Sequence, residues 1–229
     1  MRKNPFFIGQ VHHVFNKSIA EYEIFNSDSE FQRMVKAINY YKIKNPDIKL
    51  SRFIKHEKQN NSENAALAAK NRLVQIIAYC IMPTHLHLVL KQIEENGISI
   101  FMSNILNSYA RYFNIRHNRK GPLWEGRFRN VAVESDEQLL HLTRYVHLNP
   151  VTAHLVDKPE SWQASSYLEY LGVRNKKMCD FNDILEIKPV SYKVFVEDRI
   201  SYQRELSLIK SFLLEKSSHS TYEVEQGGA

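Results

Sequence analysis

The chain has 229 residues, of which 43% are hydrophobic and 24% charged, a composition that supports a folded domain with a buried core. Two cysteines, Cys80 and Cys179, are too few for a disulfide framework or a cysteine zinc site, and no apolar run approaches the roughly 20 residues that cross a bilayer. The N-terminus lacks a signal-peptide pattern, so we expect a soluble, cytoplasmic protein. The net charge of +6 favours a polyanionic partner.

The first third of the chain predicts a strand, a helix and an insertion. Residues 9–16 alternate weakly between polar and apolar side chains, which is typical of a strand. Residues 31–41 follow a group of N-cap residues and have apolar side chains at helical spacing. Residues 44–72 are polar and lysine-rich, with a short helical stretch at 65–69. We expect them to form an insertion with a mobile middle.

The rest of the chain completes a sheet and adds an appendage. Hydrophobic spacing and turn residues predict strands at 73–82, 85–91 and 130–134, a helix at 98–115, and a helix from a capping box at 135–138 to 149–150. This order favours a ferredoxin-like α+β fold, in which the hairpin lies at the middle of an antiparallel sheet with helices on one face. Residues 1–172 form the predicted domain, and 173–229 a linker, a helix at 192–216 and a disordered polar tail at 217–229.

Cationic and aromatic side chains are interleaved between the last two predicted strands. Against one acid, Glu125, the stretch carries six cations, which are Arg111, Arg116, Arg119, Lys120, Arg127 and Arg129. Cations for phosphates and aromatic faces for bases, such as that of Trp124, are typical of proteins that bind single-stranded nucleic acid. The alternative is a solvated turn whose aromatic residues enter the core.

His85 and His87 are the first candidate for a functional site. Residues i and i+2 of a strand point to the same face, and these two are about 7 Å apart at their roots, so both imidazoles can reach one divalent cation. Two histidines leave a catalytic metal site incomplete. The alternative is a pair of exposed strand histidines without a ligand.

Tyr145 and Asn149 are one turn apart on the helix predicted after residue 135. They lie at the edge of that helix's apolar stripe, so a hydroxyl and an amide oxygen are presented side by side. The alternative is a partly buried aromatic ring and a residue that ends the helix before Pro150. The residues alone leave the choice open.

Five motifs resemble those of the HUH single-tyrosine transposases. They occur in the family's order, as IMPTHLHLV at 81–89, YARYFN at 109–114, GPLWEGRF at 121–128, RYVHLNPV at 144–151, and SW followed by SSY within 161–167. The chain is most similar to the branch of REP-associated tyrosine transposases, bacterial proteins that process repetitive extragenic palindromes. Two features depart from the family pattern: Thr84 stands where asparagine is commoner, and the insertion at 44–72 is long.

The resemblance implies a role for each candidate residue. It implies that His85, His87 and Asn149 bind Mg²⁺ or Mn²⁺ and that Tyr145 is the nucleophile. The six cations and Trp124 would contact DNA. The resemblance implies a nucleoid-associated DNA strand transferase. It would cleave and rejoin single-stranded or hairpin DNA through a 5′-phosphotyrosine, with repetitive extragenic palindromes as the candidate targets.

Several alternatives stay open at this point. Tyr109 and Tyr112 are rival nucleophiles, although their place on the apolar stripe of the helix at 98–115 favours core packing or base stacking. A tyrosine has a pKa near 10, so its deprotonation needs help, from His141 one turn earlier or from a metal-bound water. The oligomeric state is open between monomer and homodimer. The rival functions are a hairpin-binding derivative that does not cleave and a metal phosphohydrolase that uses water.

Overall fold

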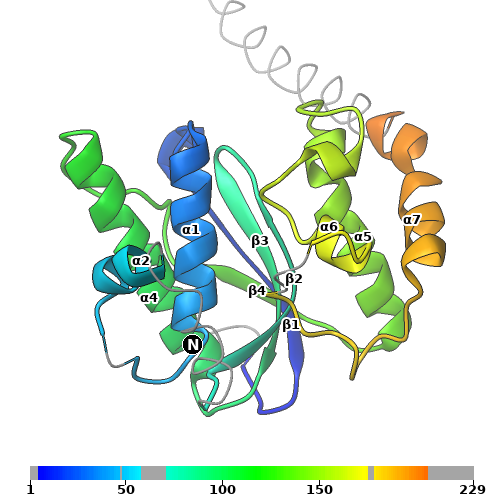
Figure 1. Cartoon of the computed structure of the whole chain (residues 1–229), viewed down its shortest axis with the longest axis horizontal. Helices are drawn as coiled ribbons and strands as arrows, with labels where there is room; N and C mark the ends of the chain where they lie inside the picture. The colour runs from blue at the N-terminus through cyan, green and yellow to red at the C-terminus, as the bar shows by residue number, and fades with distance from the viewer. Residues whose placement is uncertain (1–4, 47, 58–70, 175–177, 206–229) are drawn as a thin grey trace, which may run out of the picture.

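The computed structural model describes residues 5–46, 48–57, 71–174 and 178–205. Its centre is an antiparallel sheet of strand order β2-β3-β1-β4 (Figure 1). The strands are β1 (Val11–Lys17), β2 (Val74–Ile81), β3 (His85–Gln92) and β4 (Arg129–Ala132). The predicted α+β class and the antiparallel sheet are therefore confirmed.

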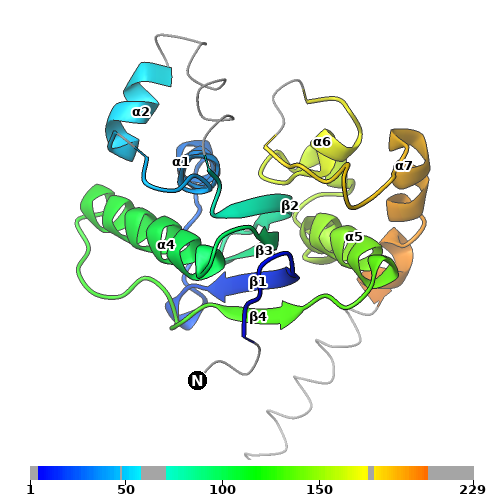
Figure 2. The same cartoon turned by 90° about the horizontal axis from the view of Figure 1, so that it is seen from below.

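Three long helices cover the two faces of this sheet. Helices α1 (Asp28–Tyr41) and α4 (Gly97–Arg116) lie on one face, as predicted for a ferredoxin-like βαββαβ unit. Helix α5 (Asp136–Thr152) follows the last strand and packs on the opposite face, which the prediction of helices on one face did not include (Figure 2). All eight residues of β2 are buried, because both of its faces are covered.

The predicted central strand β2 is at the edge of the four-stranded sheet, yet its edge is not open to solvent. Ser166 N–H donates to Tyr79 O at 3.0 Å, Ile81 N–H to Ala164 O at 2.9 Å, and Asp180 N–H to Ile76 O at 2.8 Å. The chain that follows α5 thus satisfies the backbone groups of this edge. A fully apolar strand is compatible with an edge position because this segment excludes water from it.

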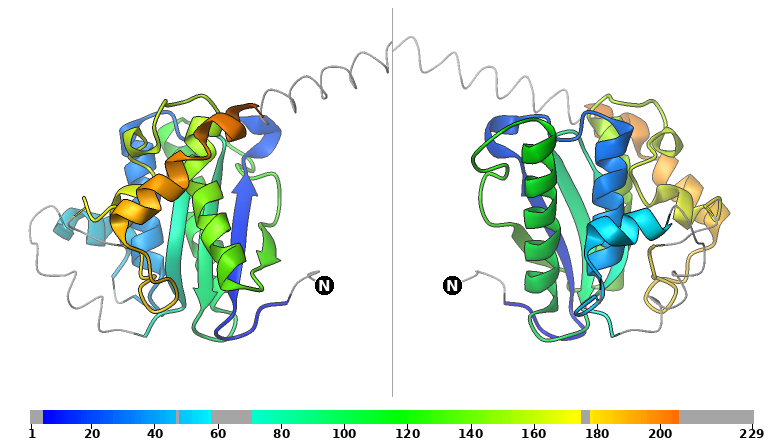
Figure 3. Two further views of the ribbon diagram at one scale, coloured as in Figure 1. Left: turned by 90° about the vertical axis from the view of Figure 1, so that its right-hand side faces the viewer. Right: turned by 60° about the vertical axis from the view of Figure 1, so that its left-hand side comes forward.

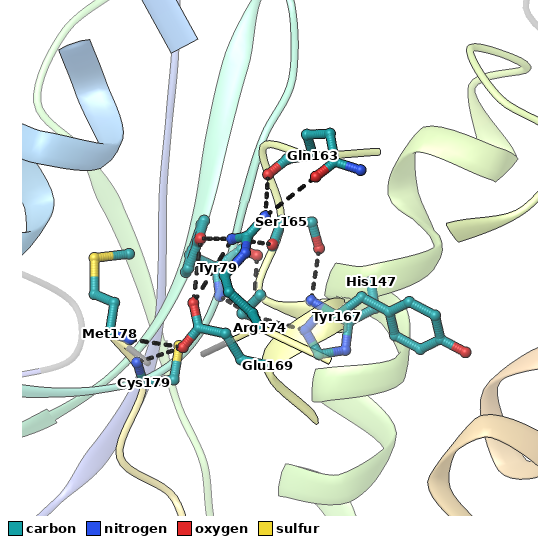
Figure 4. Close-up of polar contacts among 10 residues, drawn as sticks. Tyr79, His147, Gln163, Ser165, Tyr167, Glu169, Arg174, Met178 and Cys179 are labelled. Carbon is teal, nitrogen blue, oxygen red and sulfur yellow. Dashed lines mark hydrogen bonds and ion pairs between the residues drawn. The ribbon is translucent and has the colours of Figure 1, made fainter. Parts of the chain in front are cut away.

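A buried polar cluster holds the segment in place (Figure 4). The Glu169 carboxylate, only 1% exposed, accepts the backbone N–H groups of Met178 and Cys179, each at 2.8 Å. Arg174 lies 3.9 Å from the same carboxylate and donates to the Tyr79 hydroxyl at 2.9 Å. The buried charge is therefore paired and hydrogen-bonded, so the segment is part of the folded unit.

Shorter elements complete the molecule. They are the 3-10 turns Ile19–Glu21 and Pro159–Ser161 and the helices α2 (Leu50–Glu57), α6 (Tyr167–Tyr170) and α7 (Pro189–Glu197). Figure 3 shows α7 beside α5 in one view, and α1, α2 and α4 together in the other. Helix α2 lies in the predicted insertion and was not predicted. The helix expected at 65–69 and the tail at 217–229 lie outside the described residues.

Helix α5 runs to Thr152, so the predicted end at 149–150 is wrong. Pro150 cannot donate to the carbonyl of Val146, but the Asn149 side-chain amide approaches that oxygen at 3.5 Å, and only the last turn of the helix is affected. The predicted cap at the other end is present, because Ser135 Oγ accepts the N–H of Gln138 at 3.1 Å. None of the described helices has the length and apolar character needed to cross a membrane.

Candidate active site

A hollow of about 240 Å³ lies between the sheet and α5. Residues of three elements line it, namely His13, Phe15, Asn16 and Lys17 of β1, His85 and His87 of β3, and Tyr145 and Asn149 of α5. Strand pairing explains the contribution of β1. Phe15 is paired with His87 and Lys17 with His85, so these side chains share the sheet face that α5 covers.

Both histidines of β3 use the same ring nitrogen, Nδ1, in a hydrogen bond. His85 Nδ1 is 2.9 Å from the Thr84 hydroxyl, and His87 Nδ1 is 2.9 Å from Nε2 of His13. Within the described part of the chain, neither Nε2 has a hydrogen-bond partner. Thr84, the departure from the family pattern, therefore contacts the first histidine directly and leaves its outer nitrogen available.

Burial keeps these imidazoles neutral. It lowers the pKa of His85 to about 4, with a smaller contribution from the charge of Lys17. The pKa of His87 is lowered well below its usual value, first by burial and then by the neighbouring His13 and His85. Neutral imidazole is the form that binds metal ions, so the pair is ready to act as ligands near neutral pH.

Tyr145 faces the histidines from the opposite wall of the hollow. Its ring lies edge-on to those of His87 and His13, with centroid separations of 5.7 and 6.0 Å, and it remains 44% exposed. Burial raises the pKa of the Tyr145 hydroxyl, and the neighbouring side chain of Asn149 opposes the rise. The phenol is therefore protonated at neutral pH and accessible to a substrate.

Asn149 fits the role of a metal ligand through its oxygen. Its Nδ2 donates to the backbone carbonyl of Tyr145 at 2.9 Å, and Oδ1 takes no part in that hydrogen bond. Two imidazole nitrogens and one amide oxygen suit a divalent cation with positions left open for substrate. No group of three His, Cys, Asp or Glu side chains among the described residues could hold a metal. Among the described residues, the amide oxygen of Asn149 is therefore the candidate for a third ligand beside the two histidines.

The sequence prediction missed all four β1 residues of this hollow, and two of them, His13 and Lys17, are titratable. Both lie in a strand whose alternation is weak, and nothing local distinguishes His13 from its neighbour His12. Strand alternation does place His13, Phe15 and Lys17 on one face. That signal becomes useful only when the pairing of β1 with the histidine strand is known.

The predicted cations fall into two groups. Arg127 and Arg129 join Lys17 in a second hollow of about 220 Å³, which shares Phe15 and Asn16 with the first. None of these three cations has an ion-pair partner within the ranges that the structure describes. A positively charged hollow therefore adjoins the candidate metal site.

The other predicted DNA contacts lie farther from the hollow or have partners within the fold. Arg116 lies 3.6 Å from the Glu30 carboxylate, and Arg119 donates to the carbonyl of Pro122 at 2.8 Å. The half-buried Trp124 donates its indole N–H to Leu106 O at 3.0 Å. Arg111 on α4 and Lys120 in the loop after it are exposed.

The alternative nucleophiles Tyr109 and Tyr112 and the candidate base His141 do not line this hollow. Tyr109 is fully buried and donates its hydroxyl to Ile24 O at 2.5 Å. The Tyr112 hydroxyl accepts from Arg116 at 3.2 Å. Nδ1 of His141 accepts from Arg144 at 2.7 Å, and His141 does not line the hollow. Of these tyrosines and Tyr145, only Tyr145 lines it.

Comparisons with known proteins bear on the family and the fold of this chain. The family of IS200-like transposases matches residues 34–149, just over half of the 229 residues. A protein of Haemophilus influenzae assigned as a REP-associated tyrosine transposase is 26% identical over 104 residues. The match covers 41% of this chain and 58% of that protein, so it spans less than two thirds of the relative's length.

The fold is shared by solved structures. Among them is a REP-associated tyrosine transposase bound to a REP hairpin, with a TM-score of 0.51 and 16% sequence identity. The match covers 82% of this chain and 98% of that one. The family resemblance seen in the five motifs is thereby confirmed: the chain belongs to the IS200-like transposase family.

Proposed function

We propose that this protein is a metal-dependent DNA transposase and single-strand endonuclease, with its catalytic domain in residues 1–172 and a C-terminal extension in 173–229. The observation that carries the proposal is that Tyr145, Asn149, His85 and His87 line one hollow. One chain supplies all four side chains, so a monomer has a complete candidate site.

His85, His87 and Asn149 are the proposed ligands of Mg²⁺ or Mn²⁺. A divalent cation bound there supplies positive charge that orients the scissile phosphate and offsets the charge on its oxygens. The protein's part is to hold two neutral imidazoles and an amide oxygen beside the nucleophile. Their short hydrogen bonds to Thr84 and His13 limit the rotation of both rings.

Tyr145 is the proposed nucleophile. Its phenolic oxygen forms a bond to phosphorus while the bond from phosphorus to the 3′-oxygen breaks. The phenol loses its proton and the departing 3′-oxygen gains one, which leaves a 3′-hydroxyl and a 5′-phosphotyrosine. Attack by a second DNA 3′-hydroxyl reverses the step and joins strands. The position of the ring on a helix packed against the sheet favours in-line attack through orientation.

The proposed substrate is single-stranded or hairpin DNA, and repetitive extragenic palindromes are the candidate target. The proposed location is the cytoplasm, in association with the nucleoid. Lys17, Arg127 and Arg129 line the hollow next to the site, where a bound strand continues beyond the scissile phosphate. The remaining predicted contacts are Arg111, Arg116, Arg119, Lys120 and Trp124. We expect weaker effects from Arg116, Arg119 and Trp124, whose polar groups have partners in the fold.

The test is a covalent adduct. Purified protein is incubated with hairpin-bearing oligonucleotides and Mn²⁺ and is then denatured before electrophoresis. The wild type should form a denaturation-resistant adduct, Tyr145→Phe should form none, and the controls Tyr109→Phe and Tyr112→Phe should still form it.

Each of the other outcomes would favour an alternative nucleophile or an alternative function. An adduct with Tyr145→Phe would show that another residue is the nucleophile. Tight hairpin binding without cleavage would favour the non-catalytic DNA-binding derivative. Cleavage without an adduct, unaffected by Tyr145→Phe, would favour a phosphohydrolase that uses water.

A further inference from the structure

His13 contacts both sides of the candidate site. Its Nε2 is 2.9 Å from Nδ1 of His87, and the two rings are nearly parallel, with an angle of 20° and 5.1 Å between their centroids. The ring of Tyr145 lies edge-on to it at 6.0 Å. His13 therefore contacts both a proposed ligand and the proposed nucleophile, and no role follows for it from the sequence.

The contact between the two histidines can be made in only two ways. A neutral imidazole has one nitrogen that donates and one that accepts, so one of the two facing nitrogens must carry the hydrogen. If His13 donates, the hydrogen of His87 is on Nε2, which then cannot bind a cation. If His87 donates from Nδ1, its Nε2 is free to act as a ligand.

His85 gives an independent indication of which arrangement the site uses. Its Nδ1 faces the Thr84 hydroxyl at 2.9 Å, and a hydroxyl can accept a hydrogen from that nitrogen. Both histidines thus have, at Nδ1, a partner able to accept a hydrogen, and within the described residues neither Nε2 has a hydrogen-bond partner. Such acceptors behind metal-binding histidines hold the tautomer and the ring orientation.

We propose that His13 is a positioning residue, which accepts the Nδ1–H of His87 and so keeps Nε2 of His87 free for a divalent cation. This inference rests on the proposed function, because it takes His87 as a ligand. His13 itself does not bind the cation, because its Nε2 accepts from His87 and its Nδ1 then carries the hydrogen of the neutral ring.

The first test reads the tautomer directly in the metal-free protein. Long-range ¹H–¹⁵N NMR correlations distinguish a hydrogen on Nδ1 from one on Nε2 of His87. We expect Nδ1–H in the wild type and a shift toward Nε2–H in His13→Leu. A wild-type His87 that carries its hydrogen on Nε2 would overturn the proposal, whether or not the protein binds metal.

The second test measures Mn²⁺ affinity by electron paramagnetic resonance or calorimetry, without DNA. Loss of an acceptor behind a metal-binding histidine typically lowers affinity 10–100-fold, so we expect that loss in His13→Leu. Glutamine can place its side-chain oxygen near the position of Nε2, whereas asparagine is one methylene shorter. His13→Gln should therefore keep affinity within a few-fold, and His13→Asn should lose it.

The glutamine–asparagine pair separates positioning from packing. If His13 only fills space, both amides should behave alike, and that result would contradict the proposal. His12→Leu is the matched control, since His12 is the adjacent residue of β1 on the opposite face of the sheet and should not change Mn²⁺ affinity in folded protein. Failure of wild-type protein to bind Mn²⁺ would count against the proposed function, and the tautomer measurement would still decide the role of His13.

Discussion

At the scale of single residues, buried neutral histidines dominate the chemistry of this protein. His147 of α5 is fully buried and makes two hydrogen bonds, with the Tyr192 hydroxyl at 2.6 Å and with Ser166 Oγ at 2.7 Å. Burial lowers its pKa to about 3. The ring therefore serves as a neutral connector between α5, α7 and the segment that covers β2.

This predicts a loss of stability in acid. The unfolded chain binds a proton at His147 near pH 6.5, whereas the folded chain does so only near pH 3, so the unfolded state holds more protons between these values. The free energy of unfolding should decline as pH falls below 6.5, with His147 contributing about 2 kcal/mol of the loss between pH 7 and pH 5.

Urea denaturation at several pH values measures this loss. His147→Gln should show a smaller decline by about that amount, although it is less stable at pH 7. His141→Gln, at an exposed position of the same helix, should keep the wild-type decline. An identical decline in wild type and His147→Gln would show that His147 does not stay neutral in the folded protein.

At the scale of elements, the position of each helix depends on a few close contacts. Arg144 of α5 stacks on the ring of Phe195 in α7 at 4.1 Å and donates to its backbone oxygen at 3.3 Å. These contacts are on the turn that carries Tyr145. Helix α7 therefore fixes the rotation of α5, and with it the direction in which the proposed nucleophile points.

The start of α4 depends on an equally close approach. A Cβ atom added at Gly97 would lie 2.1 Å from the carbonyl oxygen of Leu73, directly before β2. This oxygen also accepts the N–H groups of Ile93 and Glu94, so it cannot move freely. Gly97→Ala should thus destabilise the fold by about 1–3 kcal/mol, as other overpacking substitutions do.

Thermal or chemical denaturation measures that effect, and Gly126 provides a matched control. A Cβ atom at Gly126 meets no atom within 4 Å, so Gly126→Ala should leave the free energy of unfolding almost unchanged. Equal stability of the Gly97→Ala and Gly126→Ala variants would mean that α4 can shift away from Leu73 at little cost.

At the scale of the whole molecule, the distribution of charge matters more than the total of +6. The structure divides the predicted cations into three groups. Arg127 and Arg129 line the hollow beside the candidate site, Arg116 and Arg119 have partners within the fold, and Arg111 and Lys120 are exposed on α4 and the loop after it. Only Arg127 and Arg129, with Lys17, line the hollow next to the candidate metal site.

DNA binding should reflect this division. The double substitution Arg127→Gln and Arg129→Gln should weaken the binding of hairpin oligonucleotides. It should also reduce the slope of log affinity against log salt concentration, by about 1 for each phosphate that the variant no longer neutralises. Fluorescence anisotropy at several salt concentrations measures both quantities. Arg111→Gln with Lys120→Gln removes the same charge elsewhere and should have a smaller effect. Equal reductions in affinity from the two pairs would favour non-specific attraction by the net charge.

Much of the fold and of the candidate site follows from local sequence patterns. The strands around residues 74–81 and 85–92, the capped helix after Ser135 and the pairing of Tyr145 with Asn149 all depend on periodicities of two or of 3.6 residues, which a single segment contains. The end of α5 was mispredicted because the effect of Pro150 depends on whether its last turn is supported by neighbours. Helix α2 was missed because Leu50 and Phe53 are buried only by tertiary contact within a polar stretch.

By itself, the sequence determined the family, the order of strands and helices, and a short set of candidate residues with their spacing. Only the tertiary structure decided that α5 packs on the sheet face bearing His85 and His87, that His13 belongs to the same hollow, and that β2 is an edge strand sealed by the chain after α5. The physical reason is that sheet register and helix packing join residues far apart in sequence. Their contacts depend on burial and hydrogen bonding in the whole molecule, which no local pattern contains.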